Sequence, residues 1–233
     1  VLPPDVLALA LSSAVRMAEA VQYVGLGTAE FLYSPATKRL TFLEVNPRLQ
    51  VEHVVTEMLT GVNLPALLYD LTVNRRGLAE CLRDVPGVRL DSDGRPCLPQ
   101  PSEHVVAVRL NAESPENDFR PSTGAVTSIE IPNVEHSWSY VSIHNGGRIL
   151  GSVDAQFGHL FTRGRTRDEA CRRMGRLIKH ATVTGEIDQG LRFAAQILTH
   201  PTFAANEHTT SWAKSGMFAM RGVTPSEREP APH

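Results

Sequence analysis

The segment from Glu44 to His53 places side chains that could do chemistry at every second position. It reads E-V-N-P-R-L-Q-V-E-H, so carboxylate, amide and guanidinium groups alternate with other residues. Alternate side chains of an extended chain share one face, unless Pro47 bends the chain and ends the alternation. The side chains concerned are those of Glu44, Asn46, Arg48, Gln50 and Glu52. Because apolar sequence flanks the segment on both sides, we interpret it as a site for an anion and a metal ion, with a solvated edge strand as the alternative.

A helix and a β-hairpin are expected before this segment, and further helices after it. Apolar residues at helical spacing predict an amphipathic helix at the start of the chain; they are Leu7, Leu11, Ala14, Ala18 and Val21. Residues 27–33 and 39–45 are strand-like runs joined by S-P-A-T-K, a pattern typical of a hairpin. Residues 54–73 show helical character that breaks near residues 61–65.

The register of the hairpin decides where its two acidic residues lie. A register that pairs Tyr33 with Thr41 sets Glu30 directly opposite Glu44. Facing carboxylates with Cβ atoms about 5 Å apart repel each other and destabilise a sheet. The arrangement is reasonable only where one carboxyl is protonated or a hard cation lies between them, and Mg²⁺ prefers such oxygen ligands together with phosphate. Asn46 offers a third oxygen.

The second half of the chain is expected to be rich in β-structure and to close with helices. Residues 74–103 carry turn-forming sequences and are interpreted as a long loop or linker without chemistry. Strand-like runs follow at residues 104–113, 123–131, 138–143 and 148–153. Thr166 and Glu169 form a capping box that predicts the start of a helix, and a second helix is expected around residues 189–198. Beyond Trp212 the sequence predicts a disordered tail or a non-native terminus.

Composition and charge exclude several classes of protein. With 42% apolar residues the chain can form a packed core, and 23 basic against 25 acidic residues leave no broad basic face for nucleic acid or an anionic membrane. No run approaches the ~20 apolar residues that a membrane span needs. Cys81, Cys97 and Cys171 lack C-x-x-C spacing, which argues against a disulfide framework and a zinc site. Their pattern favours a reducing compartment, the cytoplasm or alternatively a plastid or other organelle.

Several motifs resemble one family in collinear order. The segment at Glu44, followed by T-E-M-L-T-G-V-N-L, resembles the ATP-grasp core of biotin carboxylases, the ATP-dependent half of biotin-dependent carboxylases. Residues 107–124, A-V-R-L-N-A-E-S-P-E-N-D-F-R-P-S-T-G, resemble the start of that family's C-terminal domain. D-A-Q-F-G-H-L-F at residues 154–161 is similar to eukaryotic multidomain acetyl-CoA carboxylases, whereas bacterial-type relatives usually have lysine in place of its histidine. The resemblance covers about residues 5–212.

The resemblance implies an α+β fold made from parts of two domains. The C-terminal part of an ATP-grasp domain, an antiparallel sheet with helices, is expected over residues 1–73, and a loop or linker over residues 74–103. The β-rich biotin carboxylase C-terminal domain with closing helices is expected over residues 104–212. A disordered or divergent tail is expected over residues 213–233.

The resemblance also implies roles for the polar residues of the hairpin. Glu30, Glu44 and Asn46 match residues that hold the Mg²⁺ or Mn²⁺ ions bridging the phosphates of ATP. The argument from facing carboxylates reaches the same residues from the sequence itself. For Glu30, a plain surface position on a strand is the alternative.

Further residues match positions that handle bicarbonate and biotin. Arg48, Gln50 and Val51 match positions that hold bicarbonate, Arg48 through paired N–H groups that suit a planar anion. Glu52 matches the base that takes the proton of bicarbonate. Arg109 matches the arginine that steadies the enolate-like oxygen of biotin. The simpler alternatives are an ion pair between Glu52 and Arg48, and an exposed Arg109 on an alternating strand.

The function implied by the resemblance is that of a portion of the biotin carboxylase within a eukaryotic-type acetyl-CoA carboxylase, which makes malonyl-CoA for fatty acid synthesis. ATP, bicarbonate, Mg²⁺ or Mn²⁺, and biotin carried on a separate biotinyl domain would take part. The expected partners are the biotinyl carrier and carboxyltransferase domains of a homodimeric enzyme, without nucleic acid or membrane. The alternatives are the equivalent portion of a pyruvate, propionyl-CoA or urea carboxylase, or a non-catalytic remnant acting as a scaffold. The ATP lid and its lysines are expected before Val1, so the isolated chain is expected to be inactive.

Overall fold

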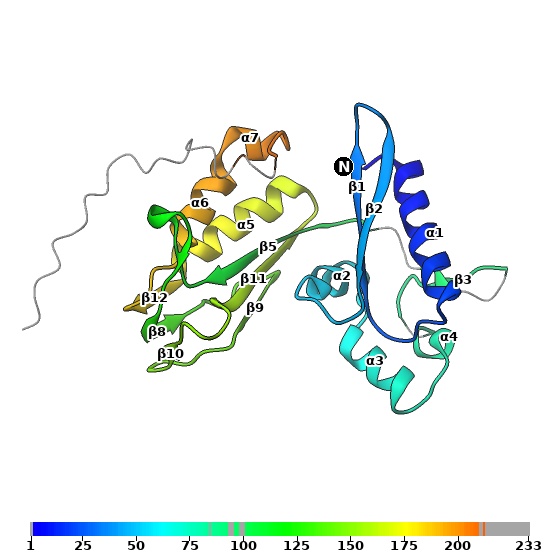
Figure 1. Cartoon of the computed structure of the whole chain (residues 1–233), viewed down its shortest axis with the longest axis horizontal. Helices are drawn as coiled ribbons and strands as arrows, with labels where there is room; N and C mark the ends of the chain where they lie inside the picture. Colours follow the sequence, from blue (N-terminus) through cyan, green and yellow to red (C-terminus); the bar gives the residue numbers. More distant parts are fainter. Residues whose placement is uncertain (1, 84, 93–95, 98–100, 210–211, 213–233) are drawn as a thin grey trace, which may run out of the picture. The chain divides into compact units, whose positions relative to one another are not determined.

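The computed structural model describes residues 2–83, 85–92, 96–97, 101–209 and 212. The tail predicted to be disordered beyond Trp212 lies outside these residues. The chain divides after Ser102 into two compact units, each with its own strands and helices (Figure 1).

The first unit contains a long helix, a β-hairpin and a group of shorter elements. These are α1 (Pro4–Ala20), β1 (Thr28–Ser34), β2 (Arg39–Asn46), α2 (His53–Thr60), α3 (Leu64–Thr72), α4 (Leu78–Cys81), β3 (Arg89–Leu90) and β4 (Pro96–Cys97). Gly61 ends α2 in the left-handed region at a φ of 74°. The side chain of Asn63 caps α3 by accepting a hydrogen bond from the Ala66 N–H at 2.9 Å. The predicted opening helix, hairpin and interrupted helical stretch are confirmed.

A β-bulge divides the β1–β2 hairpin into two registers. Near the turn Tyr33 faces Leu40, so the predicted pairing of Tyr33 with Thr41 is wrong by one residue. Below the bulge Glu30 faces Glu44, as predicted. The extra residue on β2 restores a pairing of the acidic residues that an unbroken ladder from this turn would have lost.

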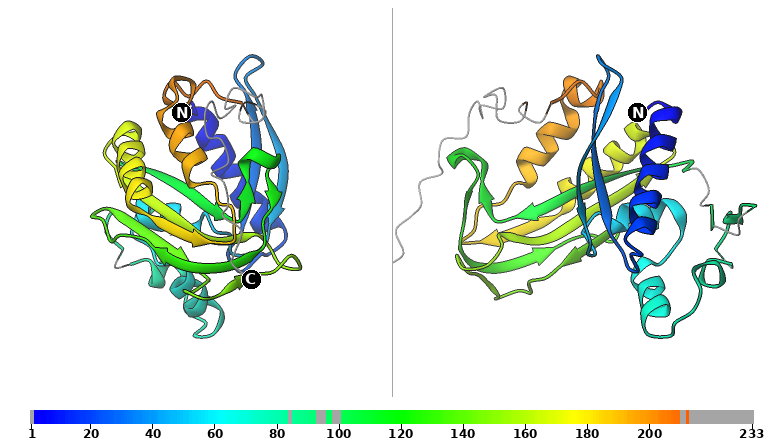
Figure 2. Two further views of the ribbon diagram at one scale, coloured as in Figure 1. Left: turned by 90° about the vertical axis from the view of Figure 1, so that its left-hand side faces the viewer. Right: turned by 45° about the vertical axis from the view of Figure 1, so that its right-hand side comes forward.

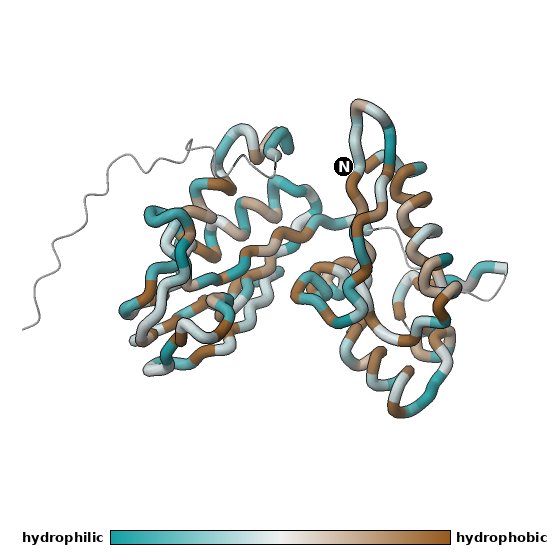
Figure 3. The backbone as a smooth tube through the Cα atoms, viewed as in Figure 1, coloured by the Kyte–Doolittle hydropathy of each residue, from teal (hydrophilic) through white to brown (hydrophobic). Residues whose placement is uncertain are grey.

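Helix α1 lies beside the hairpin (Figure 2), and apolar residues recur along it (Figure 3). Val6 is buried, whereas Leu7, Leu9, Leu11 and Val15 are exposed. The apolar pattern therefore predicts the helix correctly but does not tell which of its sides meets the hairpin.

The stretch predicted to be a plain loop contains short elements. α4, β3 and β4 all fall within residues 74–103. Arg76 is held there by Asp70 at 3.1 Å and by Glu80 at 3.0 Å. These ion pairs are solvent-exposed, so they order the chain locally and contribute little to global stability.

The second unit is built on two antiparallel three-stranded sheets, with strand orders β5–β11–β9 and β10–β8–β12 (Figure 1). Its strands are β5 (His104–Asn111), β6 (Glu113–Ser114), β7 (Arg120–Pro121), β8 (Gly124–Glu130), β9 (Ser137–Val141), β10 (Arg148–Ile149), β11 (Gln156–Gly164) and β12 (Thr182–Gly185). Its helices are the 3₁₀ turn η1 (Pro115–Asn117), α5 (Arg167–His180), α6 (Leu191–Thr199) and α7 (Pro201–Ala204). None of the helices described in the chain has the length and apolar character needed to span a membrane.

The central strand β11 was not predicted as a strand. Seven of its nine residues are buried, so neighbours cover both of its faces. A strand buried on both faces does not alternate between apolar and polar residues, and its pattern therefore carries no period of two. The short elements β12 and α7 were not predicted either.

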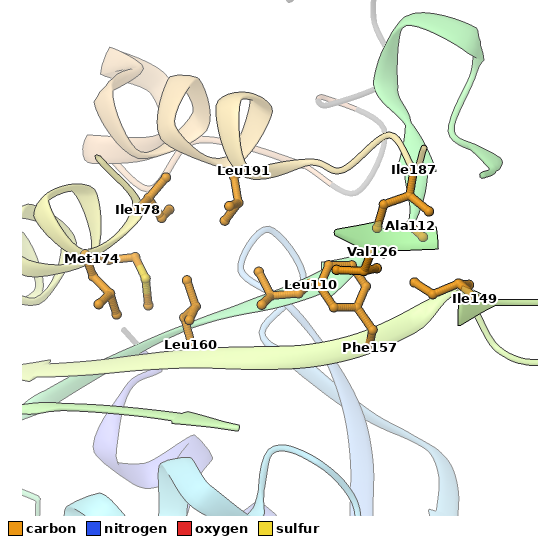
Figure 4. Close-up of a cluster of buried hydrophobic side chains, with 11 residues drawn as sticks. Leu110, Ala112, Val126, Ile149, Phe157, Leu160, Met174, Ile178, Ile187 and Leu191 are labelled. Atoms are coloured by element: carbon orange, nitrogen blue, oxygen red, sulfur yellow. The ribbon is translucent and has the colours of Figure 1, made fainter. Parts of the chain in front are cut away.

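The core of the second unit joins side chains of both sheets to those of α5 and α6 (Figure 4). Leu160 on β11 and both Met174 and Leu177 on α5 are fully buried. Thr162, also fully buried, donates its hydroxyl proton to the Ala170 carbonyl oxygen at 2.8 Å. This bond satisfies a polar group that would otherwise be costly in the core.

Helix α5 begins as the capping box predicts. The Thr166 hydroxyl accepts from the Glu169 N–H at 3.2 Å, and the Glu169 carboxylate accepts from the Arg165 N–H at 2.8 Å. Burial raises the pKa of the Cys171 thiol on this helix, so the thiol stays protonated and unreactive at neutral pH. None of the cysteines of the chain forms a disulfide with a described residue.

Replacing Leu160 by alanine should test how much of the stability lies in this core. We expect Leu160→Ala to lower the free energy of unfolding by about 2–5 kcal/mol, because a fully buried side chain leaves a cavity. Leu150→Ala is the matched control, since Leu150 is 55% exposed. Denaturant unfolding of both variants measures the difference, and equal losses would show that β11 is not central to the core.

Candidate functional site

The two acidic residues of the hairpin are joined by an amide. Asn46 Nδ2 donates to Glu30 Oε1 at 3.0 Å and to Glu44 Oε1, also at 3.0 Å. The facing carboxylates thus share one neutral donor, a solution that differs from the proton or cation expected from the sequence. Glu44 is exposed, and Glu30 and Asn46 are half-buried, so the cluster is open to solvent.

The same three side chains fit a hard metal ion. A half-turn of the Asn46 amide would exchange its nitrogen for its oxygen and give a set of two carboxylates and one amide oxygen. Such oxygen ligands suit Mg²⁺, which is commonly held by one or two carboxylates together with phosphates and water. Among the described residues no cluster of three His, Cys, Asp or Glu side chains could hold a metal ion. The third protein ligand of this candidate site is an amide, which such a cluster does not include.

Beyond β2 the chain turns and the alternation of side chains stops. The strand ends at Asn46, and the Arg48 N–H donates to the Asn46 carbonyl oxygen at 2.9 Å. The bend foreseen at Pro47 is therefore present, and the polar residues that follow do not continue the face of Glu44.

The polar residues after the bend lie along a separate pocket. Arg48, Gln50 and Glu52 line a cavity of about 330 Å³ together with residues of α1 and β1. The Oε1 atom of Gln50 is buried and has no hydrogen-bond partner among the described residues. A guanidinium, an amide and a carboxylate along one pocket can bind a small oxyanion and accept a proton from it. Val51 lies in the turn between them and does not line this pocket.

Arg109 lies on the other unit of the chain. It is an exposed residue of β5, directly opposite His159 of β11. Its neighbour Leu110 is buried in the core, so Arg109 projects from the opposite face of the sheet. The structure thus groups the sequence-predicted residues in three places: the acidic cluster, the pocket after the bend, and β5.

A contact that sequence reasoning missed begins in the wall of the pocket, at His53. His53 Nδ1 is 2.8 Å from the Gln50 carbonyl oxygen, and His53 Nε2 is 3.5 Å from Glu57 Oε2. Glu57 Oε1 in turn accepts from the Leu64 N–H at 2.7 Å. A histidine followed four residues later by a glutamate on a predicted helix is the signal that could have revealed this pair.

Two family models match the chain. Residues 107–215 match the biotin carboxylase C-terminal domain, and residues 2–76 match the ATP binding domain of the carbamoyl-phosphate synthase L chain.

Curated relatives are similar over most of the chain. The mitochondrial acetyl-CoA carboxylase of Saccharomyces cerevisiae (strain RM11-1a) is 35% identical over 208 residues, which cover 86% of this chain and 9% of that protein. Acetyl-CoA carboxylase 1 of Oryza sativa subsp. japonica is 35% identical over 227 residues, covering 90% of this chain and 10% of that protein. The chain thus spans about a tenth of the length of these relatives.

Solved structures share the fold. The biotin carboxylase domain dimer of Hydrogenobacter thermophilus 2-oxoglutarate carboxylase, in complex with MgADP, ADP and bicarbonate, gives a TM-score of 0.80 at 23% identity over 92% of this chain and 44% of that chain. The complete multifunctional pyruvate carboxylase of Rhizobium etli gives a TM-score of 0.78 at 25% identity over 91% of this chain and 20% of that chain. The α+β fold expected from the motifs is confirmed by these likenesses.

The acidic cluster makes a prediction about stability. We expect Asn46→Asp to lower the free energy of unfolding by about 1 kcal/mol in EDTA, because a third carboxylate would join two others. Added Mg²⁺ should reverse the loss, since a ligand that binds only the folded state stabilises it. The measurement is the thermal unfolding midpoint with and without Mg²⁺.

A matched control exists elsewhere in the first unit. Asn74 Nδ2 donates to Asp70 Oδ1 at 2.7 Å, so Asn74→Asp also sets two carboxylates side by side, without a third. Its unfolding midpoint should respond little to Mg²⁺. The same response in both variants would argue against a metal site at the acidic cluster.

Proposed function

The chain belongs to the biotin carboxylase family, and from this premise we propose that it is part of an acetyl-CoA carboxylase that uses ATP and bicarbonate to carboxylate protein-bound biotin. The observation that supports this most directly is the succession of two sites in one short segment. An acidic cluster suited to a metal ion is followed, across one bend, by a pocket with a guanidinium, an amide and a carboxylate. Phosphoryl transfer from ATP to bicarbonate requires both kinds of group.

The acidic cluster is proposed to serve the ATP phosphates. Glu30, Glu44 and Asn46 would hold Mg²⁺ or Mn²⁺, which when bound neutralises charge on the transferred phosphoryl group. The Asn46 amide donates to both carboxylates and keeps the three side chains close together. The H. thermophilus relative with the same fold was obtained with MgADP and bicarbonate, in agreement with this assignment.

The pocket after the bend is proposed to hold bicarbonate. Arg48 would bind the planar anion through two N–H groups, with Gln50 completing the site and Val51 contributing from the turn beside the pocket. Glu52 would take the bicarbonate proton, so that a bicarbonate oxygen attacks the γ-phosphorus of ATP and displaces ADP. The product, carboxyphosphate, decomposes to CO₂ and phosphate. Phosphate then accepts the proton of the biotin ring nitrogen, which attacks CO₂.

Arg109 is proposed to act in the second half of the reaction. Its guanidinium would stabilise the negative charge that develops on the biotin oxygen while the ring nitrogen attacks. Because Arg109 and the bicarbonate residues belong to different units of the chain, each half of the reaction draws on a different unit.

The acetyl-CoA branch of the family is favoured by identity. The acetyl-CoA carboxylases are 35% identical to the chain, whereas the pyruvate carboxylase of R. etli is 25% identical. Malonyl-CoA for fatty acid synthesis would then be the final product, and the biotinyl carrier and carboxyltransferase domains would be the partners within a homodimer. The reducing compartment predicted from the cysteines is part of the same proposal.

The metal assignment predicts a changed requirement for magnesium. In the full-length enzyme, Glu44→Gln should raise the Mg²⁺ concentration for half-maximal bicarbonate-dependent ATP hydrolysis about tenfold or more, because the site loses one of its two charges. Glu80→Gln is the control, since Glu80 is an exposed carboxylate that pairs only with Arg76 among the described residues. Normal activity of the Glu44 variant at ordinary Mg²⁺ would contradict coordination.

The assignment of Arg109 predicts a separation of the two half-reactions. Arg109→Ala should lower carboxylation of biotin by about 10²–10³-fold, the usual cost of removing one donor to a developing oxyanion. ATP binding should stay unchanged. Arg148→Ala is the control, because Arg148 is an exposed arginine of the same unit that pairs with Glu186 at 3.4 Å. Unchanged carboxylation in the Arg109 variant would remove its proposed role.

A further inference from the structure

The two ring nitrogens of His53 reach in different directions. Nδ1 lies 2.8 Å from the Gln50 carbonyl oxygen, which can only accept, so Nδ1 must carry the proton of that bond. Nε2 faces the Glu57 carboxylate at 3.5 Å. The ring therefore connects the main chain of the turn before α2 with a carboxylate one helical turn further on.

Glu57 is itself anchored on its other side. Its Oε1 atom accepts the Leu64 N–H at 2.7 Å, and Leu64 is the first residue of α3. That N–H has no partner within its own helix, so the carboxylate satisfies a group that would otherwise need water. Glu57 and His53 are both about one-fifth exposed, at 22% and 21%, so solvent weakens these contacts only in part.

The connection ends at the residues proposed to bind bicarbonate. The Gln50 carbonyl oxygen also accepts from the His53 N–H at 3.1 Å, so one histidine holds this peptide group by two donors. Residues 47–52 belong to neither a helix nor a strand. The direction in which Gln50 and Glu52 enter the pocket therefore depends on contacts of this kind rather than on a regular ladder of hydrogen bonds.

We propose that His53 and Glu57 are positioning residues that fix the bicarbonate-binding turn to the start of α3. The assignment rests on the function proposed above and deepens it. Glu57, anchored by α3, orients the imidazole; the imidazole holds the Gln50 peptide; and the peptide sets the directions of the Gln50 and Glu52 side chains. His53 is part of the pocket wall and Glu57 is not, and in this scheme both act through the Gln50 peptide group.

A pair that only stabilises its own helix would make different contacts. Residues four apart on a helix interact on its surface and stabilise that helix alone. Here the pair extends beyond α2 at both ends, to the carbonyl of Gln50 before the helix and to the N–H of Leu64 after it. Loss of a helix-stabilising pair would lower the free energy of unfolding. Loss of a positioning pair would instead weaken the binding of one substrate, bicarbonate.

The test compares the kinetics of three variants in the full-length enzyme. His53→Ala should raise the KM for bicarbonate about tenfold or more, because small misplacements of binding groups are costly, while the KM for ATP changes less than about twofold. His53→Asn should recover most of the loss, since its amide nitrogen can donate to the Gln50 carbonyl as Nδ1 does. Glu57→Gln should have an intermediate effect, because it still accepts from Leu64 but loses its charge.

The control is a change at the far end of the same helix. Thr60 Oγ1 donates to the Thr56 carbonyl oxygen at 2.7 Å and accepts from the Val62 N–H at 3.3 Å, so Thr60→Ala removes two hydrogen bonds at the end of α2 by changing a side chain that does not line the pocket. It should lower the unfolding temperature and leave the KM for bicarbonate unchanged.

The outcomes distinguish a failure of the positioning role from a failure of the proposed biotin carboxylase function. If the variants raise the KM for bicarbonate and the KM for ATP equally, or lose stability with normal kinetics, the positioning role is overturned. The proposed function still stands in that case, provided that the unaltered enzyme hydrolyses ATP in a bicarbonate-dependent way. No such hydrolysis by the unaltered enzyme would overturn both. If His53→Ala does not fold, the Glu57→Gln variant provides the test. An unchanged KM for bicarbonate in Glu57→Gln would refute the positioning role.

Discussion

Two negative charges at facing positions of one β-ribbon are the constraint on which the candidate site depends. Glu30 and Glu44 lie opposite each other, and facing like charges destabilise a sheet unless something lies between them. The Asn46 amide fills that role by donating to both carboxylates. The strand ends at Asn46, and the bend that follows at Pro47 brings the next polar residues to a separate pocket. The proposed metal site and the proposed anion site are thereby separated by only a few residues.

Much of the fold could be predicted from local pattern, and the failures have physical causes. The opening helix, the hairpin and the start of α5 at Thr166 follow from spacing and capping chemistry, which act over a few residues. Strand β11 was recognised as a motif but not as a strand, because burial on both faces removes the alternation of polar and apolar residues. The short strands β3 and β4, within a stretch predicted to be a loop, pair over two residues each, too few for a pattern to emerge.

The sequence names candidate residues for the site but not the geometry in which the structure holds them. The pairing of Glu30 with Glu44 could be predicted from the sequence, but the bulge that produces it could not. The position of a bulge depends on the twist and packing of the strands rather than on local propensity. The donation by Asn46 was also unforeseen, because a side-chain amide offers a donor at one end and an acceptor at the other. The pair of His53 and Glu57 escaped notice for a different reason: its significance lies in the contacts of Gln50 and Leu64, which spacing alone does not reveal.

The bulge also bears on how this hairpin tolerates change in length. Phe31 faces Phe42 while Glu30 faces Glu44, which leaves Leu43 as the residue without an opposite partner. Its side chain is 54% exposed, so the core loses little without it. Deleting Leu43 would join the two halves of the ladder into one regular run and keep every other facing pair intact. A deletion at any paired position of β2 would instead slide one half against the other and invert its faces. Among homologous hairpins, length differences should therefore accumulate at this position or in the turn, and the acidic pair should stay in register through both.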